Sequence, residues 1–176
     1  MNDSPPRGRS RTAAAALLFV LLALVLSACR PAAAPAGVKF AVSFPAERSE
    51  TPLDGRLLLL LSTNDEPEPR FQISDGPSTQ LVFGIDVDGL APGAEAVVDA
   101  SAFGYPLRSL AEVPAGEYFI QALLHRYETF RRSDGHVVKL PMDRGEGQRW
   151  NAAPGNLISA PRKISFDPGE AETVRI

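Results

Sequence analysis

The sequence contains few of the residue types on which most catalytic and metal chemistry depends. Its 176 residues include one cysteine, two histidines and one tryptophan. A single cysteine excludes an internal disulfide and any zinc site built from several thiolates. Lys and Arg together number 18 against 21 Asp and Glu, which gives a formal net charge of −3. Because phosphate binding needs a concentrated basic surface, we expect no nucleic-acid partner for so mildly acidic a chain.

Long hydrophobic runs are scarce, and the longest one is too short to cross a bilayer as a helix. Residues 13–26 carry no charged or polar side chain and follow Arg7, Arg9 and Arg11, but they number only 14, whereas a membrane-spanning helix needs roughly 20 residues. A positive segment, a short apolar segment and then small residues are typical of a secretory signal peptide, which we predict for residues 1–28. A transmembrane anchor is the alternative.

The end of this apolar run resembles the lipobox of bacterial lipoproteins, L-[AS]-[GA]-C, because it reads Leu26-Ser27-Ala28-Cys29. In that family the cysteine thiol is joined to a diacylglycerol, the preceding peptide bond is cut and the new amino terminus is acylated. The resemblance implies lipidation of Cys29, a membrane as partner through this lipid anchor, and a place in the cell envelope facing the periplasm or the exterior. Arg30 stands where an aspartate often marks inner-membrane retention, which favours delivery to the outer membrane.

The residues after the cysteine separate the leader from a single domain. Residues 29–37 are rich in Ala and Pro, and we interpret them as a flexible linker. A buried structural cysteine is the alternative to lipidation, but this linker composition argues against it. Residues 38–176 have the size of one domain. The chain from Cys29 onward carries 15 basic and 20 acidic residues, a net charge of −5, which keeps a tethered domain soluble.

Apolar and polar residues alternate with a period of two through this domain, which is typical of half-buried strands. Five consecutive leucines, Leu57 to Leu61, predict a strand that is covered on both faces. Turn sequences such as Asp75-Gly76-Pro77 and Asp167-Pro168-Gly169 separate the segments. Strands are predicted at residues 38–44, 56–62, 79–87, 95–100, 117–130, 136–140, 163–166 and 172–176. Many short strands without helical periodicity predict an all-β fold, an antiparallel β-sandwich.

One segment makes this fold class more specific. Residues 113–122, VPAGEYFIQA, resemble the entry into strand F of immunoglobulin-like domains. In those domains a tyrosine near the start of the strand hydrogen-bonds back to the preceding corner, and Tyr118 would take that role. Ile120 stands where antibody domains have a cysteine, in keeping with a core without a disulfide. The resemblance therefore implies an immunoglobulin-like antiparallel β-sandwich; the alternative for Tyr118 is an ordinary half-buried strand residue.

Candidates for catalysis and metal binding are few. A nucleophilic hydrolase needs a nucleophile, a base and an orienting acid, yet the sequence has no G-x-S-x-G elbow and only His125 and His136 as bases. We therefore predict no catalytic constellation, no enzyme activity of this chain by itself and no cofactor. Asp86 and Asp88 alternate before Gly89 as carboxylates do in calcium loops, and they are the weak metal candidates.

The segment from residue 126 to residue 156 combines aromatic residues, arginines and glycines. Because Trp, Tyr and Arg dominate binding energies at interfaces, Tyr127, Arg131, Arg132 and Trp150 are the predicted binding surface. For Trp150 itself, however, the interpretation that we favour is that it covers the core of the sandwich from a long loop.

Residues 114–154 are also similar to the amino-terminal β-sandwich module that precedes esterase-D-like α/β-hydrolase domains in some secreted bacterial proteins. We predict a lipid-anchored, non-enzymatic domain of the cell envelope that binds a partner or acts as a spacer. The alternative, implied by this resemblance, is an accessory module whose catalytic hydrolase domain is missing or separately encoded, and which would be its partner.

Overall fold

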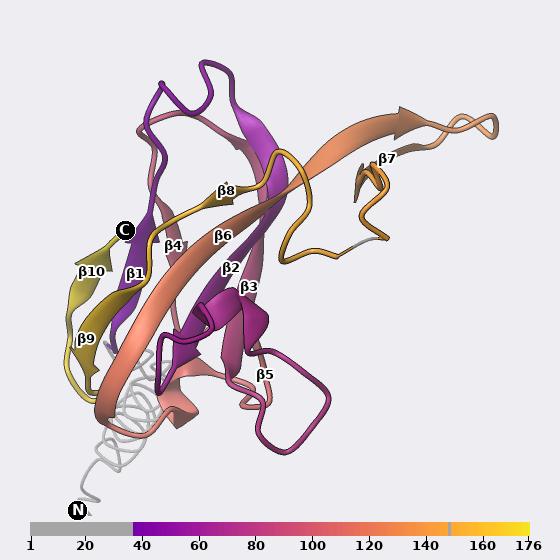
Figure 1. Cartoon of the computed structure of the whole chain (residues 1–176). Coiled ribbons are helices and arrows are strands. Elements are labelled where there is room, and N and C mark those ends of the chain that lie inside the picture. Colours follow the sequence, from indigo (N-terminus) through magenta and orange to yellow (C-terminus); the bar gives the residue numbers. More distant parts are fainter. Residues whose placement is uncertain (1–36, 148) are drawn as a thin grey trace, which may run out of the picture. The chain divides into compact units, whose positions relative to one another are not determined.

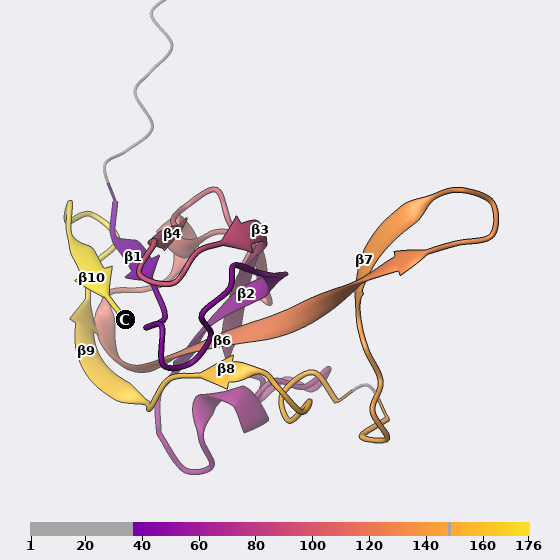
Figure 2. The ribbon, with the colours of Figure 1, turned by 90° about the horizontal axis from the view of Figure 1, so that it is seen from above.

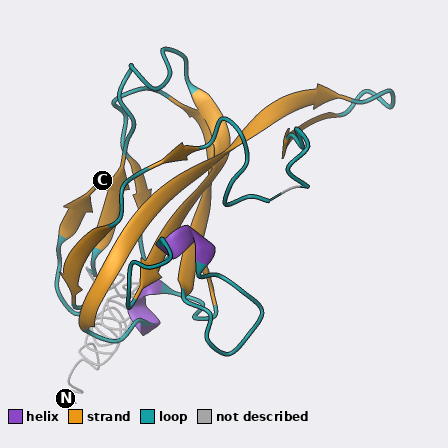
Figure 3. Cartoon of the chain, in the orientation of Figure 1, coloured by secondary structure: helices purple, strands orange, loops and turns teal. Residues whose placement is uncertain are grey.

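The computed structural model describes residues 37–147 and 149–176, and this part of the chain is built from strands and loops (Figures 1 and 3). The described residues contain no α-helix and two single-turn 3-10 helices, η1 (Pro69–Phe71) and η2 (Leu110–Glu112). The predicted signal peptide, Cys29 and all but the last residue of the linker lie outside the described residues.

In the described part of the chain, strands form two sheets. One sheet has the order β10-β1-β4, and the other has the order β5-β3-β2-β6-β7 with β8 and β9 also paired to β6. The strands are β1 (Lys39–Val42), β2 (Leu53–Ser62), β3 (Leu81–Leu90), β4 (Ala96–Val98), β5 (Phe103–Tyr105), β6 (Gly116–Arg131), β7 (Val137–Pro141), β8 (Leu157–Ile158), β9 (Arg162–Phe166) and β10 (Thr173–Arg175). The prediction of an all-β fold is confirmed, and each predicted strand is present; β5 and β8 were not predicted.

Strand β6 runs through the larger sheet and pairs along both edges. One edge pairs with β2 in antiparallel register, from Gly55 opposite Arg126 to Ser62 opposite Phe119. The other edge pairs in turn with β9, β8 and β7. Figures 1 and 2 show β6 curling along the domain before it continues into a hairpin with β7 that projects from the body.

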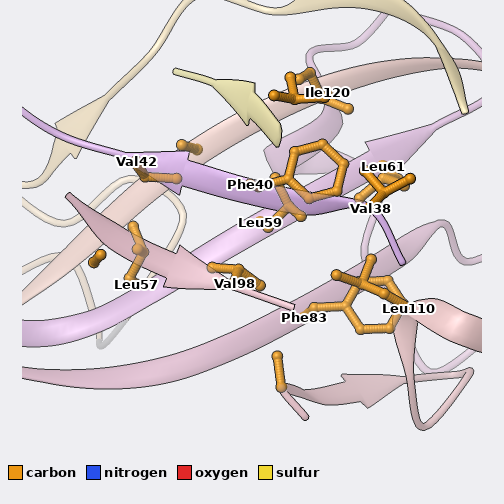
Figure 4. Packing of buried hydrophobic residues seen from close by; sticks show 14 of the residues in the cluster. Val38, Phe40, Val42, Leu57, Leu59, Leu61, Phe83, Val98, Leu110 and Ile120 are labelled. Atoms are coloured by element: carbon orange, nitrogen blue, oxygen red, sulfur yellow. The ribbon is translucent and has the colours of Figure 1, made fainter. Parts of the chain in front are cut away.

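The core lies between the two sheets. Phe40 and Val42 of β1 face Leu57, Leu59 and Leu61 of β2, and these side chains belong to one buried cluster (Figure 4). The intervening leucines face the other way, where η1 packs against β2 and β6. Leu60 is fully buried on that side and Leu58 is partly exposed. The leucine run is thus a strand covered on both faces over most of its length, as predicted.

The corner before β6 is closed by Tyr118. Its hydroxyl donates a hydrogen bond to the carbonyl oxygen of Pro114 over 3.1 Å, so the predicted bond back to the corner is confirmed. The Tyr118 ring meets the ring of Phe166 edge-on with centroids 6.0 Å apart, and Phe166 stacks on Phe40 at 6.3 Å. Because Phe40 belongs to the smaller sheet, these three rings join the two sheets at one end of the core.

Replacing Tyr118 by Phe tests the contribution of this corner. The variant keeps the aromatic packing and loses one hydrogen bond, so we expect the free energy of unfolding in urea to fall by about 1 kcal/mol. The matched control is Tyr105→Phe, because Tyr105 is 41% exposed and its hydroxyl can be satisfied by water. Equal stability of the Tyr118→Phe variant and the control would show that the corner bond contributes nothing.

Candidate binding surface

The larger sheet has one face against the smaller sheet and one face away from it, which we call the outer face. Figure 2 shows η1 on the side of β6 away from β1 and β4, and thus over the outer face. The register places Arg56 of β2 on this face between His125 of β6 and Asp86 of β3. In the same way, Leu58 lies between Leu123 and Gly84. Side chains from three strands therefore line up across the outer face.

A groove of about 290 Å³ runs over these residues, and we call it the aromatic groove. Strands β2, β3 and β6 supply most of its lining, the segment after η1 supplies one residue, and the turn before β8 supplies the tryptophan. The lining residues are Arg56, Leu58, Ile73, Val82, His125, Tyr127 and Trp150. Apart from one arginine and one histidine, these side chains are apolar or aromatic.

One asparagine fixes the tryptophan segment on β6. The Asn156 side-chain nitrogen donates to the backbone carbonyl of Trp150 over 2.7 Å, and the Asn156 Oδ1 lies 3.1 Å from Nδ1 of His125. The same oxygen accepts from the backbone N–H of Arg126 at 3.4 Å. The His125 ring in turn meets the Tyr127 ring edge-on at 6.3 Å. The aromatic residues of the groove are therefore positioned by bonds within the chain itself.

A buried glutamine fixes η1 beside β6. Gln121 is fully buried. Its Nε2 donates to Oε2 of Glu68 at 2.8 Å and to the carbonyl of Ser159 at 3.0 Å. Its Oε1 accepts from the backbone N–H of Arg70 at 3.1 Å. The Arg70 guanidinium donates to the carbonyl of Asn151 at 2.7 Å. Hydrogen bonds from Gln121 and Arg70 hold the pKa of Glu68 below its usual value. This network ties η1 both to β6 and to the tryptophan segment.

The structure brings together two of the four predicted binding residues. Tyr127 and Trp150 both line the aromatic groove, and Trp150 lies on the outer face rather than over the core between the sheets. Burial, followed by the nearby charge of Asp86, raises the pKa of Tyr127. Arg131 and Arg132 lie farther along, at the end of the β6–β7 hairpin, where Arg132 pairs with Asp134 at 2.8 Å.

Sequence reasoning missed several residues of the groove. The sequence does indicate the face on which Leu58 and Val82 lie, because each alternates with leucine or phenylalanine residues that face the core. Arg56 stands two positions before Leu58 and shares its face. Ile73 has no such signal, because it lies in an irregular segment after η1.

The other predicted candidates are dispersed. Asp86 pairs with Arg56 at 3.0 Å, and Asp88 pairs with Lys139 of the hairpin. Across residues 37–147 and 149–176, no three side chains of His, Cys, Asp or Glu form a group that fits a metal ion. His136 lies 3.2 Å from Asp134 in the hairpin turn, whereas His125 lines the groove.

Lys139 connects the projecting hairpin to the body. Its ammonium lies 2.8 Å from Oδ2 of Asp54 on β2 and also contacts Asp88 on β3. Asp54 additionally accepts from the backbone N–H of Gly89 at 2.7 Å. The hydrogen bond from Lys139, followed by that from Gly89, lowers the pKa of Asp54 from its usual 3.8. The two carboxylates in turn raise the pKa of Lys139.

Comparison with protein-family models, with curated proteins and with solved structures finds no match for this chain. Within the residues that the structure describes, no helix has the length and apolar character needed to cross a membrane.

The ion pair of Asp54 predicts a dependence of stability on pH. A carboxyl whose pKa is lowered by folding stabilises the protein above its unfolded pKa, here 3.8, and loses that effect as the pH falls through the folded value. Lys139→Met should therefore reduce the free energy of unfolding at neutral pH, and the difference from the unsubstituted protein should shrink below pH 3.8. Urea titrations of both proteins, repeated in steps of roughly half a pH unit between about pH 2.5 and 7, measure this difference in the free energy of unfolding.

The matched control is Lys163→Met, because the Lys163–Glu117 pair is more than half exposed on both sides and such pairs contribute little. A Lys139→Met effect that stays constant across this pH range would contradict the role of the Asp54 carboxylate.

Proposed function

We propose that this chain is a lipid-anchored, non-enzymatic binding domain of the bacterial cell envelope, and that its ligand surface is the aromatic groove. The observation that carries this proposal is the convergence of Tyr127, Trp150 and His125 with apolar side chains on the outer face. A sheet face turned to solvent ordinarily carries polar residues. Trp, Tyr and Arg are the residues on which binding energy concentrates, and Arg56 completes this set at the groove.

The rigidity of the groove supports a binding role. Asn156 fixes the tryptophan segment, and Gln121 fixes the segment around η1, both without a ligand. A site whose walls are already in place loses little conformational entropy when its ligand arrives. Preformed, mostly apolar pockets with a few polar groups are typical of ligand sites.

The chemistry of the groove supports a role without catalysis. His125 has an amide oxygen of Asn156 beside its Nδ1, whereas a catalytic base is usually oriented by a carboxylate. Among the described residues that line the groove there is no serine, threonine or cysteine to act as a nucleophile.

The strand order supports the finer fold assignment to the immunoglobulin-like sandwiches. With β6 taken as strand F, the order β9-β6-β2-β3 corresponds to G-F-C-C′, and the antiparallel pair β1–β4 corresponds to B–E. The Tyr118 bond at the corner before β6 fits the same assignment. There are two departures: β10 takes the place beside β1 but runs parallel to it, and β5 pairs with β3 although it follows β4 in the chain.

The anchor proposal rests on Leu26-Ser27-Ala28-Cys29, and a single substitution tests it. Cys29→Ser removes the thiol that would carry the lipid, so we expect the protein to leave the membrane fraction when cells are broken and centrifuged. Ser27→Ala keeps the lipobox pattern and serves as the control that stays with the membranes. A Cys29→Ser protein that is still cleaved and still sediments with membranes would overturn the anchor.

Trp150→Ala tests the groove. Its hydrogen bond to Asn156 uses the backbone carbonyl, so the tryptophan segment should keep its position. Three fractions of the envelope are immobilised separately: peptidoglycan, lipopolysaccharide and envelope proteins. We expect one of them to retain the purified protein. Retention should weaken at least tenfold in the variant, because a central tryptophan contributes about 2 kcal/mol or more.

The matched control is Phe103→Ala, because Phe103 is 72% exposed and lies outside the groove. Equal retention of the Trp150→Ala and Phe103→Ala proteins, or no retention of the unsubstituted protein on any fraction, would overturn the groove as the ligand surface.

A further inference from the structure

A second cavity, of about 280 Å³, lies on the inner side of the larger sheet, between the two sheets. Val42 and Phe44 line it from the end of β1, Leu57 from β2, Leu124 from β6 and Leu157 from β8. The aromatic groove and this cavity thus use opposite faces of the same sheet.

The cavity is formed because the two ends of the core are filled differently. Large rings of Phe40, Tyr118 and Phe166 fill the end near the start of β1. Figure 4 shows Val42 and Leu57 at the other end of the cluster, away from Phe40. There the lining of β6 includes Ala122, which offers only a methyl group. The lining at this end, mostly aliphatic with the one aromatic residue Phe44, leaves room for an apolar ligand.

One ionisable side chain accompanies this apolar lining. Among the described residues that line the cavity, Arg48 alone has an ionisable side chain, and its residue is exposed to solvent. No ion pair involves Arg48 within residues 37–147 and 149–176. A guanidinium binds a carboxylate through two parallel hydrogen bonds. An apolar cavity with one cation suits an amphiphile with an anionic head.

The volume sets the length of the apolar part. A dry protein cavity of about 150 Å³ binds benzene, which has six carbon atoms. By proportion, a cavity of about 280 Å³ accommodates on the order of ten carbons.

We propose that this cavity binds a free fatty acid of about ten carbons, with its aliphatic chain between the sheets and its carboxylate on Arg48. The proposal is independent of the aromatic groove and of its ligand. A single carboxylate on an unbranched chain satisfies both the apolar lining and the one cation.

Equilibrium dialysis of radiolabelled decanoate against the full-length chain in phospholipid nanodiscs tests this, with empty nanodiscs as the blank. We expect saturable binding of one decanoate per chain. Affinity should rise about fourfold for each methylene added from octanoate to decanoate.

Arg48→Ala should weaken decanoate binding about tenfold and leave decan-1-ol binding unchanged. Arg131→Ala, which removes an exposed arginine in the projecting hairpin, is the matched control and should bind decanoate normally.

Ala122→Phe provides the second test, because the larger ring fills the cavity and should abolish decanoate and decan-1-ol binding alike. If this buried substitution prevents folding, the exposed Arg48→Ala variant still decides the matter. The absence of saturable decanoate binding overturns the proposal. Equal affinity for decanoate in the Arg48→Ala and Arg131→Ala proteins overturns it as well, because the carboxylate would then have no partner at Arg48.

Discussion

The structure depends on the requirement that the backbone of β6 find hydrogen-bond partners along both edges. Buried N–H and C=O groups are costly when unpaired, and β6 presents 16 residues of them. One edge is satisfied by β2, and the other is divided among β9, β8 and β7. The chain that connects β7 to β8 must therefore return over the surface beside β6. That return segment carries Trp150, so the place of the aromatic groove follows from the pairing of β6.

The same constraint explains the polar network under the groove. Strand β2 sends Leu57 into the core and Leu60 to the other side, where Leu60 is fully buried. Covering that side brings η1 onto the sheet, and it also buries Gln121. A buried amide is tolerated only when its donors and acceptor are paired. Glu68, Arg70 and the carbonyl of Ser159 supply those partners, and no buried side-chain polar atom in the described residues lacks one.

Much of this fold could be predicted from alternation along the sequence, and the exceptions have physical causes. The strands with clear alternation were found, whereas β8 has two residues and β5 has three, too few to establish a period. In β5 the requirement is tertiary, because a Cβ at Gly104 would lie 2.3 Å from the ring of Phe83. Of the groove, Tyr127 and Trp150 were predicted from residue type alone. Alternation along β2 places Leu58 on the face opposite Leu57 and Leu59, but its position between β3 and β6 depends on the strand register, which no local pattern reveals.

The two proposed sites lie on opposite faces of one sheet, and alternation along β6 assigns neighbouring residues to different sites. Leu124 lines the cavity and His125 lines the groove, so only the thickness of a strand separates them. Ser159 joins the cavity to the Gln121 network. It lines the cavity, its carbonyl accepts from Gln121, and its hydroxyl accepts from the backbone N–H of Ala122 at 2.9 Å. Contact of this kind does not by itself couple two sites, because coupling requires an element with two arrangements whose balance each ligand changes. The fully paired Gln121 network favours one arrangement, and the two sites are therefore expected to bind independently.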